Sequence, residues 1–249
     1  MTEIETLVRK RVFENDLKSE DKIRFRAKRS GIFPASTSLL YKEMSAGNIS
    51  GFTVPAINIR TLTYDIARLI FRLIKEMKVG PVIFELARSE IGYTNQPISE
   101  YAVSVLGAAI TEKYRGPVFL QLDHAQVNAK KYFSSEQERK AELKALEHLV
   151  AEAISAEVYN IDIDASTLVQ LEKPTLEQQQ EHNCTVTSHF VKFIREKQPK
   201  GIVTTIGGEI GEVGKENSTP EELEAFVKGV KERLGLDYTP INKVSVQIG

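Results

Sequence analysis

The feature that most constrains the fold of this chain is an alternation of short apolar runs with longer amphipathic stretches, which begins near residue 35. Six apolar runs are expected to form strands, at residues 53–59, 81–87, 117–123, 158–164, 201–206 and 243–248. The stretches between them are expected to form helices, at residues 63–78, 98–113, 135–156, 175–197 and 219–234. Strands that alternate with helices predict βα units and a parallel sheet.

The two faces of these strands differ in polarity. Because side chains alternate in direction along a strand, strand 117–123 has one apolar face and one that becomes polar: Val118, Leu120 and Leu122 against Phe119, Gln121 and Asp123. Strand 158–164 shows the same division, with Asp162 and Asp164 on its polar face. A sheet covered by helices on both sides would have almost wholly apolar strands. The division therefore favours a (β/α) barrel, whose inward residues line a pocket at the strand ends.

The strand count favours an incomplete barrel, because a closed barrel of this type needs eight strands. We expect a barrel domain over residues 35–249 that ends after its sixth strand. Residues 1–34 carry nine Lys or Arg and six Asp or Glu, so we expect a solvated helical extension there. In the helix at 63–78, apolar residues form a single stripe that should lie on the sheet: Ile66, Leu69, Ile70, Leu73, Ile74 and Met77.

The bulk composition excludes several classes of partner. Lys plus Arg is 33 and Asp plus Glu is 34, so no strong overall field attracts nucleic acid or a membrane surface. No apolar stretch has the roughly 20 residues that span a bilayer, and the first residues lack the apolar core of a secretion signal. Cys184 is the single cysteine, which suits a reducing compartment. We therefore expect a cytoplasmic protein.

An acid and an imidazole end the segment VFLQLDHAQ, residues 118–126. Asp123 is expected to be the last inward residue of its strand, and His124 is expected to begin the loop at the barrel mouth. There an imidazole can bind a metal, and a carboxyl group beside it can exchange a proton with the same substrate. The alternative is a hydrogen-bonded interior pair with no role in catalysis.

Two further clusters follow later strands. In IGGEIGEVGKENS, residues 206–218, Glu209 lies nearest the strand end and is the best candidate to share a metal with His124, whereas Glu212 is interpreted as a solvated loop acid. In NIDIDAS, residues 160–166, Asp164 lies nearer the mouth than Asp162. A histidine, a glutamate and an aspartate from separate strand ends suit zinc or another borderline divalent ion. The other histidines fall in expected helices, where ligation is less favoured: His148, His182 and His189.

The ordered set of these motifs resembles the class II, metal-dependent fructose-bisphosphate aldolases and their ketose-bisphosphate relatives. The resemblance runs from LLYKEMSAGNISGFTVPAINIR, residues 39–60, through QLDHAQ and YNIDIDAS to GGEIGEVGKENS and the final KVSVQIG. It covers roughly the last 210 residues. It implies an eight-stranded (β/α) barrel, in agreement with the strand pattern.

The resemblance also implies roles for particular residues. Asp123 falls on the proton donor to the aldehyde oxygen, and Glu216 is the closest match to the glutamate that deprotonates the ketone. The metal positions fall on His124 and Glu209, and Asp164 matches an aspartate of a secondary metal position. Substrate-side positions fall on Asn58 and Ser89.

The function implied is zinc-dependent cleavage and formation of a carbon–carbon bond in a ketose bisphosphate, a phosphorylated sugar of glycolysis, by a homo-oligomer. The family's other two zinc histidines and most of its phosphate contacts would lie beyond Gly249, so these 249 residues alone are expected to have little or no activity. Two alternatives stay open: a non-catalytic sugar-phosphate-binding or assembly subunit, and another metal-assisted lyase or hydrolase. No lysine is found on the inward faces that were compared, so a Schiff-base route is less favoured than a metal.

Overall fold

A computed structural model describes residues 2–211, 217–236 and 238–247. Within them, seven strands form one parallel sheet: β1 Ile32–Ala35, β2 Ala56–Asn58, β3 Ile83–Ala87, β4 Gly116–Gln126, β5 Asn160–Asp164, β6 Thr205–Glu209 and β7 Lys243–Ser245. The last six correspond to the six strands expected from the sequence. The largest shift is in β6, which begins and ends later than expected.

The helices expected between the strands are present, and three shorter helices that were not expected, at residues 38–45, 88–94 and 129–134, lie among them. In chain order the helices are α1 Glu3–Glu14, α2 Leu17–Arg29, α3 Ser38–Ser45, α4 Thr63–Met77, α5 Arg88–Thr94, α6 Ile98–Thr111, α7 Ala129–Ser134, α8 Glu136–Ser155, α9 Leu176–Gln179, α10 Glu181–Lys197 and α11 Pro220–Leu234, with a short 3-10 turn at Ser166–Leu168. The expected helix at 175–197 is divided into α9 and α10. The start of α11 is capped reciprocally by Thr219 and Glu222, with Pro220 in the first turn.

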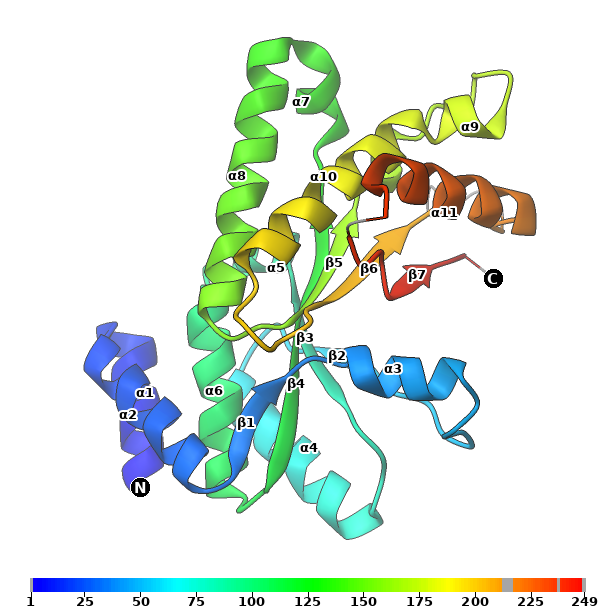
Figure 1. Ribbon diagram of the computed structural model, residues 1–249. Coiled ribbons are helices and arrows are strands. Elements are labelled where there is room, and N and C mark those ends of the chain that lie inside the picture. The colour runs from blue at the N-terminus through cyan, green and yellow to red at the C-terminus, as the bar shows by residue number, and fades with distance from the viewer. Residues whose placement is uncertain (1, 212–216, 237, 248–249) are drawn as a thin grey trace.

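The order of strands is that of an open (β/α) barrel. β2 to β7 pair in sequence order, each parallel to the next. Within the described residues no strand joins β7 back to β2, so the barrel is incomplete. The carboxyl ends of β2 to β7 lie at one rim, where the chain continues into loops and short helices (Figure 1). This rim is the place where ligand sites form in barrels of this type.

β1 was missed in the sequence because it is short, contains Pro34 and directly follows a basic helix. It pairs with the first residues of β4, Ile32 opposite Gly116, whereas β5 pairs with β4 from Gln121 onward. β3 pairs with β4 from Phe119 to Asp123 on the opposite edge, so β1 and β5 pair with successive parts of the same edge of β4. Asn160 joins them: its Nδ2 donates to the carbonyls of Ala35 (3.1 Å) and Leu120 (2.8 Å).

The expectation of a solvated N-terminal extension is wrong. Residues 3–29 are helical, but α1 and α2 lie beside α6 (Figure 1) and bury an apolar face in the main core. The buried members of this face are Ile4, Leu7, Val8, Ile23 and Ala27. Few but well-spaced apolar residues are enough for a helix to pack, because burial depends on one stripe rather than on average composition.

The apolar stripe expected on α4 is confirmed in part, because Ile66, Ile70 and Ile74 are partly buried against the main core. Thr63, Ala67 and Phe71 are buried, whereas Leu69 and Met77 are 55% and 67% exposed. The helix is therefore rotated relative to the expected stripe. The expected stripe therefore includes one side of the buried face and extends past it to exposed residues.

The division of the strands into an apolar and a polar face is confirmed. Val118, Leu120 and Leu122 are buried in the main core beneath the helices. On the opposite face, polar side chains of β3, β4, β5 and β7 contact one another inside the barrel. Within the described residues, no helix combines the length and apolar composition needed to cross a membrane.

Candidate active site

A β-bulge in β4 places Asp123 and His124 on the same side of the sheet. Leu122 pairs with Ile161 and Ala125 pairs with Ile163, so two residues of β4 stand opposite one residue of β5. His124 has φ +40°, a left-handed conformation that costs energy for a residue with a side chain. The expectation that His124 begins a loop is wrong, because β4 continues to Gln126. Without the bulge, strict alternation would direct the two side chains to opposite faces.

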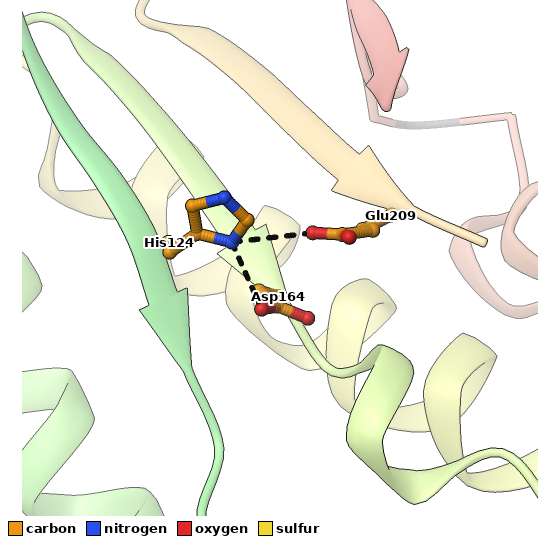
Figure 2. Close-up of side chains that lie close together, drawn as sticks. All are labelled: His124, Asp164 and Glu209. Carbon is orange, nitrogen blue, oxygen red and sulfur yellow. Dashed lines mark hydrogen bonds and ion pairs between the residues drawn. The ribbon is translucent and has the colours of Figure 1, made fainter. Parts of the chain in front are cut away.

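His124 meets Asp164 and Glu209 at the rim. Its Nδ1 lies 3.0 Å from Asp164 Oδ2 and 3.3 Å from Glu209 Oε2. Figure 2 shows the three side chains converging from β4, β5 and β6, with dashed lines from one imidazole nitrogen to both carboxylates. The carboxylates are buried, and the histidine is 46% exposed. Three residues that are distant in sequence thus form one compact acidic and imidazole cluster, called here the rim triad.

Each carboxylate of the rim triad ends a strand. Asp164 is the last residue of β5, and its Oδ1 accepts from the backbone N–H and hydroxyl of Ser166 (3.1 and 2.7 Å). Its Oδ2 also accepts from Gln126 Nε2 at 2.6 Å. Glu209 is the last residue of β6 rather than part of the loop after it, and Asn183 Nδ2 donates to its backbone carbonyl at 2.7 Å. Both acids are therefore held on rigid elements.

The charges in the rim triad favour a cation at its centre. Hydrogen bonds to Asp164 and then to Glu209 raise the pKa of His124 to about 11, although burial lowers it. For Asp164 burial raises the pKa, but hydrogen bonds from His124, Ser166 and Gln126 outweigh this and lower it. The imidazolium thus balances two carboxylates. One nitrogen and two oxygen ligand atoms within 4.8 Å of one another are a donor set that suits a divalent ion of the zinc type.

Asp123 lies beside the rim triad and is held by a separate set of hydrogen bonds. Its Oδ1 is 3.8 Å from His124 Nε2, and its Oδ2 accepts from Asn58 Nδ2 at 3.0 Å. The same Asn58 nitrogen donates to Glu90 Oε2 at 3.0 Å. Ser89 is exposed and lines the same cavity as Asn58 and Asp123. The structure therefore brings the two expected substrate-side residues together with the expected proton donor.

A polar layer lies inside the barrel below the rim triad, and sequence reasoning missed its lysine. Lys243 Nζ donates to Gln121 Oε1 at 2.7 Å and lies 2.8 Å from Asp162 Oδ1. Gln121 Nε2 in turn donates to Glu85 Oε2 at 2.5 Å. The premise that the inward faces carry no lysine is thus wrong, because Lys243 shares the parity of Ser245. What favours a metal over a Schiff base is the set of ligand atoms in the rim triad.

Glu85 is an acid of this layer whose pKa is raised. Burial, followed by repulsion from Asp123 and Asp162, raises its pKa to about 7. Gly207 makes room for the layer: a Cβ there would stand 2.3 Å from Asp162 Oδ1 and 3.1 Å from Lys243 Cε. A side chain at position 207 of β6 would therefore collide with Asp162 and Lys243, which explains the glycine there.

Two cavities meet at the site. One, of about 260 Å³, lies over β4 to β7 and is lined by the rim triad, Asp123 and Lys243. The other, of about 610 Å³, lies over the ends of β2, β3 and β4 and is lined by Asn58, Arg60 and Arg88. Asp123 and His124 border both. The arrangement can hold a molecule that extends to either side of these two residues.

The remaining sequence candidates lie elsewhere. Glu216 and Glu212 fall outside the described residues. The other three histidines are in helices, as expected, and their contacts are remote from the rim triad: His148 with Glu152, His182 with Tyr132, and His189 with Glu147. Of the four histidines, only His124 is part of the triad.

Comparison with known proteins gives a family and a distant structural likeness. No match was found among curated protein sequences. A solved structure, described as D-psicose 3-epimerase in the presence of D-fructose, is 13% identical, with a TM-score of 0.47, over 77% of this chain. The chain spans 62% of the length of that structure. The family model for fructose-bisphosphate aldolase class-II matches residues 40–240, more than half of the chain. This chain therefore belongs to the class II fructose-bisphosphate aldolase family.

Proposed function

We propose that this chain forms part of a metal-dependent aldolase that cleaves and forms a carbon–carbon bond in a ketose bisphosphate such as fructose 1,6-bisphosphate. The observation that carries the proposal is the convergence of His124, Asp164 and Glu209 on one point, with Asp123 alongside. Membership of the class II aldolase family supports the reaction type.

His124, Asp164 and Glu209 are the residues that would hold the divalent ion, for which zinc is the leading candidate. When bound, such an ion polarises a carbonyl group and lowers the cost of removing the neighbouring proton. The half-exposed imidazole and two buried carboxylates leave one side of the cluster open toward the cavity. A substrate oxygen could therefore approach from that side.

Asp123 would give its proton to the oxygen of the aldehyde half as the bond forms, and take it back on cleavage. Asn58 holds the carboxyl group by donating to Oδ2, so Oδ1 remains directed toward His124. A general acid must reach the reacting oxygen within hydrogen-bond distance. The position of Asp123 at the junction of the two cavities meets this requirement for a substrate that occupies both.

Glu216 remains the proposed base that removes the proton next to the ketone. This assignment rests on the match of IGGEIGEVGKENS to the family motif alone, because the residue lies outside the described part of the chain. Mutagenesis of Glu216 is the direct test of this role.

The experiment is a cleavage assay of the protein with fructose 1,6-bisphosphate. Turnover should vanish on chelation and return with zinc. His124→Ala should lose both bound zinc and turnover, because it removes the ligand between the two carboxylates. His148→Ala, on the exposed face of α8, is the matched control and should retain both.

Two results would contradict the proposal. Turnover that survives complete chelation would show that catalysis does not depend on a metal. Protein that binds zinc through His124 but cleaves no ketose bisphosphate would favour a binding or assembly role instead.

A further inference from the structure

The larger cavity contains two arginines whose orientation is fixed by buried acids. Arg60 follows β2, and its Nε donates to Glu90 Oε1 at 2.5 Å. Arg88 follows β3 directly, and its Nη1 donates to Glu142 Oε1 and to the carbonyl of Gln126, each at 2.5 Å. Glu90 and Glu142 are 4% and 1% exposed. Each guanidinium group is therefore held in place by a buried glutamate.

The anchoring leaves hydrogen-bond donors for a ligand. A guanidinium group carries five N–H groups on three nitrogens. Nε and Nη2 of Arg88 have no hydrogen-bond partner among the described residues, and Arg60, near Tyr93, keeps 62% of its side chain exposed. Lys131 Nζ, 3.8 Å from Glu142, adds a third cation to the cavity wall.

These cations line the larger cavity, whereas the whole rim triad borders the smaller one. The rim triad borders the smaller cavity, where the ketone half would bind, and Asp123 marks the junction. A substrate that reacts at Asp123 extends its other half, the aldehyde half, into the cavity of Arg60 and Arg88. A planar guanidinium pairs in a two-point fashion with phosphate or carboxylate oxygens.

We propose that Arg60 and Arg88 bind an anionic group, a phosphate or a carboxylate, on the aldehyde half of the substrate. The assignment of the halves rests on the proposed function, but the anion site itself does not require a bound metal. The positive charge and the planar donor geometry of the two guanidinium groups favour a ligand with paired anionic oxygens.

The test is calorimetric binding of three probes that share one carbon skeleton: glycerol 3-phosphate, glycerate and glycerol. Metal-free chain should bind at least one anionic probe more tightly than glycerol. Arg60→Gln should weaken binding of that probe about tenfold, because hydrogen bonds to charged groups have about that effect on affinity. Arg88→Lys keeps the charge beside Glu142 but loses the fork, and should also weaken it. The stronger of the two anionic probes identifies the group that is recognised.

Arg72→Gln is the matched control, since Arg72 pairs with Glu112 away from the cavity. It should bind the probes as the unchanged chain does. The proposal fails if glycerol binds as tightly as the anions, or if Arg60→Gln and Arg88→Lys leave binding unchanged. An equal loss in Arg72→Gln would also overturn it, because general charge would then explain the effect. None of these results depends on turnover, so failure of the anion site and failure of the aldolase assignment are distinguishable.

Discussion

Replacement of Lys243 by methionine should destabilise the protein through the polar layer inside the barrel. The change removes the cation that lies 2.8 Å from Asp162 and the donor to Gln121, while it keeps most of the side-chain volume. Asp162 would then remain near the acids Glu85 and Asp123 without its direct ion-pair partner.

The size of the effect follows from the exposure of the pair. Removing one partner of a fully buried ion pair costs about 3–5 kcal/mol, whereas exposed pairs contribute about 0–1 kcal/mol. Lys243 and Asp162 are 25% and 24% exposed, which places them between these limits. We therefore expect the free energy of unfolding to fall by about 1–3 kcal/mol.

Urea unfolding of Lys243→Met, of Asp162→Asn and of the double variant would measure this effect. The double variant should recover part of the loss, because the unbalanced charge is then absent and the two changes are coupled. Lys140→Met is the control, since Lys140 pairs with Glu136 on the surface of α8. If Lys243→Met is no less stable than Lys140→Met, or if Asp162→Asn recovers nothing, the reasoning is refuted.

Three further predictions concern the surroundings of the site. Ser166→Ala removes the hydroxyl that donates to Asp164 at 2.7 Å, and should lower zinc affinity about tenfold in a chelator competition assay. Glu85 has a pKa raised from 4.5 to about 7, so the folded state binds more protons between these values and stability should fall as the pH rises through that range. Glu85→Gln should abolish this fall, which is on the order of 3 kcal/mol in pH-dependent urea unfolding. Gly207→Ala should lower the free energy of unfolding by about 1–3 kcal/mol, because its Cβ would stand 2.3 Å from Asp162 Oδ1.

Two of these predictions have a control variant within the chain. Ser134→Ala removes a hydroxyl that donates only to the carbonyl of Lys131, and should leave zinc affinity unchanged. Gly92→Ala adds a Cβ with no neighbouring atom within 4 Å, and should not destabilise α5. A Ser166→Ala protein with unchanged zinc affinity, a Glu85→Gln protein with the original pH dependence, or a Gly207→Ala protein as stable as Gly92→Ala would each contradict the corresponding argument.

The sequence was informative where periodicity and order along the chain determine the structure. The alternation of apolar runs predicted β2 to β7, and the alternation of polarity predicted which side chains face inward. Because parallel strands end at one rim, placing His124, Asp164 and Glu209 at strand ends was enough to predict that they lie near one another. The distances from His124 Nδ1 to the carboxylate oxygens of Asp164 and Glu209, 3.0 and 3.3 Å, agree with that expectation.

The sequence was less informative where the structure departs from regular periods. The bulge at Asp123 and His124 has no clear local signature, and only pairing with β5 reveals it. Lys243 was missed because the inward face of β7 was compared only from Ser245 onward. The anchoring of Arg60 by Glu90 and of Arg88 by Glu142 depends on contacts across 30 and 54 residues. Such contacts carry no signal in a single sequence.

Crystals of the protein soaked with zinc, and measured for anomalous scattering at the zinc edge, test the central claim most directly. The account predicts a zinc ion bound by His124, Asp164 and Glu209 together, with ligand distances of about 2.0–2.2 Å. Zinc bound elsewhere, while His124 keeps its hydrogen bonds to the two carboxylates, would contradict it.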